Sequence, residues 1–171
     1  MEKIIKSAYD ALKNDNQYAA LIVALIIPDI CAALENGETT GSKYASWFEN
    51  NLPEYKGYLS GKDCYALRCA ILHQGKDDVS GQRIKEVLDY VIFMEPQVPV
   101  HLILGKNVVL NDQLKKSFLQ LNVSMFIVDI CKAAEKWLKT ASGNKEIQRR
   151  LRETIEIHKE GYIHHGVMKF G

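Results

Sequence analysis

The chain has 171 residues, of which 47% are hydrophobic and 25% are charged. This length and composition suit one domain with a sizeable core and exclude a disordered or low-complexity chain. The formal net charge is +1, so the chain lacks the basic excess of a dedicated nucleic-acid-binding domain, although a local basic patch is compatible with it. We therefore predict a single domain over residues 1–171.

The four cysteines form no CxxC pair, and the amphipathic segment at 1–16 does not resemble a secretory signal. We expect reduced, mostly buried thiols and a cytoplasmic protein. The apolar run at 18–34 carries Asp29 as its only charge and is interrupted by Pro28. Because a membrane-spanning helix needs about 20 largely apolar residues, we expect this run to form a buried core helix and predict no membrane association.

Apolar residues recur at helical spacing in four segments of the first half of the chain. Asp15 or Asn16 can cap the second segment. Ser60 and Asp63 resemble a capping box before the fourth, and Gly75 stands where a left-handed C-cap is expected after it. The predicted helices cover residues 3–13, from the break at 14–16 to about 35, 43–52 and 62–74.

The middle of the chain favours a small amount of β-structure. Residues 83–94 fit helical spacing, but the end of this run also suits a strand. Pro96 and Pro99 then frame the apolar stretch Val-His-Leu-Ile-Leu. We expect a β-hairpin or meander inserted at about 89–110.

The helical period returns in the last third of the chain. We predict one helix at 112–140 and a last amphipathic helix at 145–159, followed by a tail. The predicted fold class is therefore mainly α, with a helical core at about 3–75 and 112–160 and the β insertion between them.

The stretch Tyr-Ala-Leu-Arg-Cys-Ala-Ile-Leu-His-Gln-Gly at 65–75 places Arg68 and His73 in a helix that is apolar almost all round. An arginine in a central helix needs an anion, because an unpaired buried charge is very costly. Asp29 and Asp129, both in apolar helical runs, are the candidate partners. In this interpretation Arg68 forms an ion pair that fixes helix packing, and His73 lies in the last turn, where the helix dipole favours its cation.

The same two residues also have a catalytic interpretation. An arginine can stabilise charge on a phosphate, and a histidine near neutral pKa can transfer protons. On an ideal helix Arg68 and His73 are about 7.5 Å apart along the axis and roughly 140° apart around it. They would therefore flank one groove, or point into a cleft shared by two copies of the chain.

The sequence Arg68-Cys-Ala-Ile-Leu-His73 resembles the Arg-x4–6-His motif of the HEPN superfamily. The resemblance implies an all-α core, a homodimer and metal-independent cleavage of RNA, with Arg68 and His73 catalytic. Active members usually carry Asn, Asp or His directly after the arginine, where this chain has Cys69. Members that bind nucleic acid or proteins without cleaving RNA are also known, so a non-enzymatic interaction module is the alternative function.

A broader resemblance, carried by the segments at 18–35, 60–75 and 128–138, is to a family of uncharacterised bacterial proteins. It implies no activity. Asp63 and Tyr65 flank the motif and are candidates for contact with a substrate, although a capping role for Asp63 is simpler. Cys64, Cys69 and His73 lack further metal ligands nearby. We therefore predict no metal and no cofactor.

Overall fold

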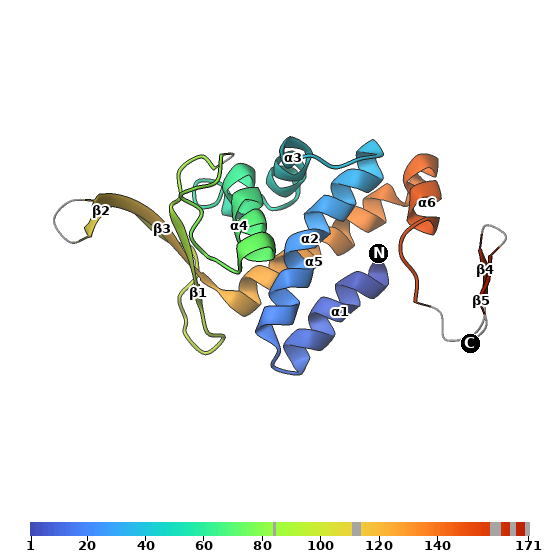
Figure 1. The fold of residues 1–171 in the computed structure, drawn as a ribbon, viewed down its shortest axis with the longest axis horizontal. Coiled ribbons are helices and arrows are strands. Elements are labelled where there is room, and N and C mark those ends of the chain that lie inside the picture. Colours follow the sequence, from blue (N-terminus) through green and yellow to red (C-terminus); the bar gives the residue numbers. More distant parts are fainter. Residues whose placement is uncertain (84, 111–113, 158–161, 165–166, 170–171) are drawn as a thin grey trace.

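Six α-helices form most of the computed structural model, which describes residues 1–83, 85–110, 114–157, 162–164 and 167–169 (Figure 1). The predicted mainly helical fold class is confirmed. The helices are α1 (Glu2–Lys13), α2 (Gln17–Asn36), α3 (Gly41–Asn51), α4 (Gly61–Gln74), α5 (Val123–Thr140) and α6 (Lys145–Arg152). The strands are β1 (Tyr90–Met94), β2 (Ile103–Leu110), β3 (Leu114–Asn122), β4 (Tyr162–His164) and β5 (Val167–Lys169).

Helix α2 is the central helix of the bundle, and α1, α3 and α5 pack against it (Figure 1). The side chain of Asn16 caps its first turn by accepting a hydrogen bond from Ala19 N, and Gly37 ends it in the left-handed conformation. By length and composition α2 is apolar enough to cross a membrane, but half of that apolar stretch is buried inside the fold. Its apolar character is accounted for by its place in the core.

The core joins the helices to one face of the sheet. Aromatic rings meet edge to face across it, with Trp47 against Trp137 at 6.3 Å between centroids and Tyr55 against Phe126 at 5.7 Å. The sheet contributes the buried side chains of Val91, Leu119 and Leu121.

The sheet has the strand order β1-β3-β2, with β1 parallel to β3 and β2 antiparallel to it. The prediction of a hairpin or meander at 89–110 was therefore wrong in both extent and topology. The sheet continues to Asn122, and β1 pairs with the third strand rather than with the second. The connection between β1 and β2 allows this arrangement, because it carries the chain past the position of β3 to the far edge of the sheet. The chain then returns as the β2–β3 hairpin and places β3 beside β1.

The prediction of a continuous helix at 112–140 was also wrong, because its first part is β3 and α5 begins only at Val123. Leu119 and Leu121 alternate into the core at strand period. The helical prediction had instead used Leu114, Phe118 and Leu121, whose spacing also fits a helix. Asn122 marks the junction. Its side-chain oxygen accepts a hydrogen bond from Met125 N, and its amide nitrogen donates to the carbonyl oxygens of three residues of the β1–β2 connection, Glu95, Pro96 and Val98.

Helix α6 ends at Arg152, earlier than the predicted end at 159. Its first turn packs through buried Ile147, whereas Ile155 and Ile157 are exposed. The segment after Arg152 therefore lacks the core contacts that stabilise a short helix. Residues 158–161 of the predicted helix and tail lie outside the described residues, and β4 and β5 pair as a two-stranded hairpin within the predicted tail.

Candidate functional site

Helix α4 carries the Arg–His motif and has a capped start and a capped end. Ser60 Oγ accepts a hydrogen bond from Asp63 N, and Gly75 adopts φ +64° at the C-cap, as the sequence predicted. The helix packs against α3 at close range, because a Cβ atom on Gly61 would lie 2.2 Å from Ala45 O. This contact fixes the helix that positions Arg68 and His73.

Arg68 lies against α2, where its Nε donates a hydrogen bond of 2.8 Å to Asp29 Oδ2. The side chains retain 22% and 12% exposure respectively, so the pair is at the edge of the core rather than sealed inside it. Thr39 Oγ1 donates to the other carboxylate oxygen of Asp29 at 3.3 Å. Burial lowers the pKa of Arg68, but the charge and hydrogen bond of Asp29 outweigh it and raise that pKa.

Tyr65 and Cys69 complete what we call the Arg68 cluster, which comprises Asp29, Thr39, Tyr65, Arg68 and Cys69. The guanidinium carbon of Arg68 is 5.9 Å from the centroid of the Tyr65 ring. Burial, followed by the neighbouring Cys69 thiol, raises the pKa of Tyr65. All five side chains therefore meet at one partly exposed position between α2 and α4.

His73 lies in the last turn of α4 and is exposed. No hydrogen bond or ion pair joins its side chain to another residue within the described ranges. The helical rise still separates it from Arg68 by about 7.5 Å along the axis. One chain alone does not bring the two side chains together, so a joint reaction would need groups from a second copy.

Asp129, the other candidate partner of Arg68, lies elsewhere and contacts the β1–β2 connection. Its Oδ2 accepts a hydrogen bond of 2.9 Å from the Tyr55 hydroxyl and is 3.8 Å from His101 Nε2. His101 Nδ1 accepts a hydrogen bond of 3.2 Å from Asn122 N. The sequence did not predict this network, because His101 and Asp129 lie 46 and 74 positions after Tyr55 and share no local pattern with it.

His101 is held with Nδ1 unprotonated, because that nitrogen receives the Asn122 N–H. Burial lowers the pKa of His101, and the nearby Asp129 carboxylate only partly offsets this effect. Burial also raises the pKa of Tyr55, with a smaller contribution from Asp129. The network of Tyr55, His101 and Asp129 therefore favours a neutral histidine and a neutral phenol, and it fixes the β1–β2 connection against α5.

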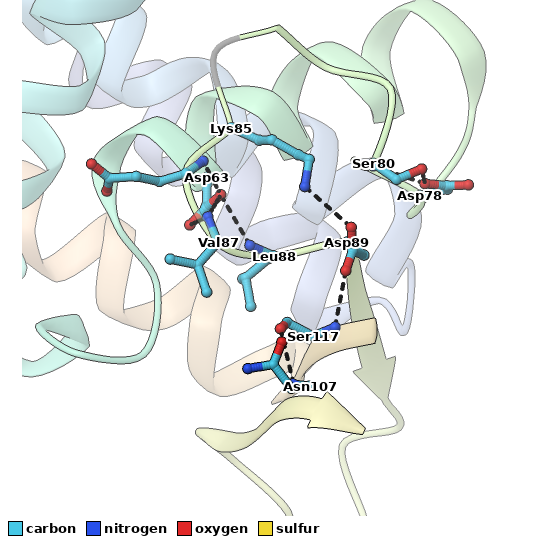
Figure 2. Close-up of polar contacts among 10 residues, drawn as sticks. Asp63, Asp78, Ser80, Lys85, Val87, Leu88, Asp89, Asn107 and Ser117 are labelled. Carbon is cyan, nitrogen blue, oxygen red and sulfur yellow. Dashed lines mark hydrogen bonds and ion pairs between the residues drawn. The ribbon is translucent and has the colours of Figure 1, made fainter. Parts of the chain in front are cut away.

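Asp63 is almost completely buried and holds the segment before β1 against α4 (Figure 2). Its Oδ1 accepts hydrogen bonds from the backbone N–H groups of Glu86, Val87 and Leu88, at 2.7 to 3.3 Å. Ser60 Oγ donates to its other oxygen at 3.0 Å. Both oxygens are thus occupied by protein donors, which makes Asp63 an anchor for the 85–89 segment.

Cys64, which precedes the motif, is buried away from the partly exposed Arg68 cluster. Its Sγ lies 3.4 Å from the Tyr44 hydroxyl. Burial raises the pKa of the Cys64 thiol to about 12, so it carries little thiolate at neutral pH. Across the described residues, no group of three His, Cys, Asp or Glu side chains is gathered closely enough to hold a metal ion.

Comparison with known proteins returned no matching family model, no matching curated protein and no matching solved structure.

Proposed function

We propose that the chain is a HEPN-like protein that cleaves RNA without a metal ion, with Arg68 and His73 as the reacting pair. The observation that carries the proposal is the exposed, unpaired His73 one turn and a half after a partly exposed Arg68 on the same capped helix. Asp29 engages Nε of the guanidinium, and the side chain of Arg68 remains partly exposed. A mainly helical bundle that includes α4 agrees with the resemblance.

The proposed step is attack of a ribose 2′-hydroxyl on the adjacent phosphorus. His73 accepts the 2′-hydroxyl proton or donates a proton to the leaving 5′-oxygen, and the products are a 2′,3′-cyclic phosphate and a free 5′-hydroxyl. Arg68 offsets the additional negative charge on the phosphate oxygens in the transition state. Since the two residues of one chain lie roughly 140° apart around the helix, we propose that a homodimer places Arg68 of one copy beside His73 of the other.

A second candidate function is a non-enzymatic interaction module. The 2.8 Å contact between Arg68 and Asp29 favours it, because this pair also makes sense as a packing element between α2 and α4. Cys69, where active relatives of the resembled superfamily usually carry Asn, Asp or His, favours it as well.

Cleavage of a labelled mixed RNA pool in EDTA tests the proposed function. We expect the wild type to cleave RNA and the folded double variant Arg68→Ala with Asp29→Asn to lose at least about 100-fold in rate. The second substitution removes the unpaired carboxylate that Arg68→Ala alone would leave. Asp29→Asn alone is the matched control and keeps the arginine. Full activity in the folded double variant would contradict the role of Arg68.

A further inference from the structure

The three-stranded sheet has one face that no helix covers. This outer sheet face consists of Tyr90 and Ile92 on β1, Phe118 and Gln120 on β3, and Ile103 on β2, which are neighbours in the strand register. None of them belongs to the buried core or packs against it, whereas the alternating Val91, Leu119 and Leu121 are buried. In Figure 1 the sheet lies at one end of the molecule, with the helices together on its other side.

Two aromatic residues are neighbours on the outer sheet face, and both side chains are partly exposed. Tyr90 and Phe118 are direct register partners on adjacent strands. The Phe118 ring lies flat over Gly105, since a Cβ atom there would be 2.5 Å from the ring. The Lys116 ammonium is 5.5 Å from the centroid of the Tyr90 ring, which places a cation beside this ring. Aromatic rings displayed in this way on a sheet are surfaces on which unpaired nucleobases stack.

The charge of the strands suits a polyanion. The described residues of β1, β2 and β3 include Lys106, Lys115 and Lys116 and no aspartate or glutamate. By strand alternation Lys116 shares the outer sheet face with Phe118, whereas Lys115 lies on the opposite face of β3. Lys106 and Lys115 form no ion pair with any residue in the described ranges, and both belong to the projecting β2–β3 hairpin (Figure 1).

Among the acidic residues that border β1, Asp78 and Asp89 lie at its start and their carboxylates already have partners, whereas Glu95 directly follows Met94 and is exposed. Asp78 binds the backbone and hydroxyl of Ser80, and Asp89 binds Ser117 N and Lys85 (Figure 2). These partners therefore already reduce the repulsion that Asp78 and Asp89 would exert on a bound polyanion.

We propose that the outer sheet face binds single-stranded RNA, with neighbouring bases stacked on Tyr90 and Phe118. Gln120, on the same face, is placed to hydrogen-bond base edges, and Lys116 to contact a phosphate. The choice of RNA rests on the proposed function, to which this surface adds a place where substrate is held apart from Arg68 and His73. A second copy of the chain fits this face less well than RNA does. A symmetric face-to-face dimer would bring the outer faces of both copies together, and their Lys116 side chains would repel each other.

Binding of fluorescent 2′-O-methylated 12-mers, one for each base, tests the proposal, since these probes cannot be cleaved by 2′-hydroxyl attack. We expect wild-type binding that weakens as salt rises. Tyr90→Leu with Phe118→Leu keeps the apolar bulk but removes both rings, so we expect affinity to fall about 10-fold or more. Tyr58→Leu is the matched control, because Tyr58 is an exposed aromatic residue in the loop between α3 and α4, away from the sheet face. Circular dichroism establishes that each variant is folded.

Three results would overturn the proposal. One is unchanged affinity in the folded double variant, and another is no binding of any probe by the wild type, because stacking tolerates every base. The third is a wild-type dimer that the two substitutions dissociate. The proposed function fails separately, since it depends on cleavage by Arg68 and His73. If the wild type cleaves no RNA but binds the probes, and the double variant loses this binding, the sheet proposal stands and the proposed nuclease activity is wrong.

Discussion

Arg68 combines a packing contact with a position from which it can reach a ligand. Its Nε is bound by Asp29, yet more than a fifth of its side chain is exposed. The sequence predicted that an arginine in an apolar helix needs an acidic partner and narrowed the choice to Asp29 and Asp129. It did not predict which one, because the decision depends on how α2 and α5 pack around α4.

Removing one member of the Arg68–Asp29 pair leaves the other partly buried and without its charged partner. We expect Arg68→Met and Asp29→Asn each to lower the free energy of unfolding by about 2 kcal/mol. The double variant should lose less than the sum of the two, because neither charge is then unpaired. Urea unfolding of the four chains measures this coupling, and strictly additive losses would show that the contact contributes nothing to stability.

His101 makes stability depend on pH. Its pKa in the folded chain lies below 6.5, so the unfolded chain binds the proton more readily. The stabilisation is complete above pH 6.5 and is lost as the pH falls toward the folded pKa. The groups that face the ring are the Asp129 carboxylate, the Tyr55 hydroxyl and the Asn122 N–H.

We therefore expect the stability advantage of the wild type over His101→Gln to be larger at pH 7.5 than at pH 5.5. Urea unfolding at the two pH values measures the difference. The other four histidines are present in both chains and cancel in the comparison. An advantage that grows on acidification would mean that the ion pair with Asp129 dominates instead.

At the scale of the elements, caps and buried apolar runs were predictable, whereas the sheet was only partly so. Asn16, Ser60 and Gly75 act locally, so their roles could be predicted from neighbouring residues. Residues 114–122 satisfy strand and helix periods alike, and pairing with β1 and β2 decides between them. Those partners are distant in sequence, so no local pattern contains the answer.

The crossing of α3 and α4 depends on the absence of a side chain at Gly61. A Cβ atom there would lie 2.2 Å from Ala45 O and 2.6 Å from Ala45 Cα, and backbone atoms cannot yield as a flexible side chain would. We expect Gly61→Ala to destabilise the fold by about 2 kcal/mol. Gly143→Ala, where nothing lies within 4 Å, is the control in thermal unfolding. Equal stability of the two variants would show that the helices separate without cost.

At the scale of the whole molecule, we propose two surfaces for partners among the described residues. The Arg68 cluster with His73 lies on α2 and α4, and the outer sheet face lies at the end of the molecule (Figure 1). Only the first was visible in the sequence, as a motif. The outer sheet face depends on the register that places Tyr90 beside Phe118. These residues are 28 positions apart, so no local sequence pattern predicts that they are neighbours.

If two copies complete one site, activity depends on their association. We expect a concentration-dependent homodimer in analytical ultracentrifugation and a specific RNA-cleaving activity that falls when the chain is diluted below the dissociation constant. Mixing Arg68→Ala with His73→Ala should restore activity, because a mixed dimer retains one intact pair. A monomer that cleaves at constant specific activity would contradict the shared site.

The most direct test of the central claim is the rate of RNA cleavage in EDTA by His73→Ala beside its neighbour variant Gln74→Ala. Both side chains are exposed on the last turn of α4, so neither substitution should disturb the fold. We predict that His73→Ala loses at least about 100-fold in rate while Gln74→Ala keeps the wild-type rate. Equal cleavage by the wild type and a folded His73→Ala would contradict the claim that this histidine transfers the proton.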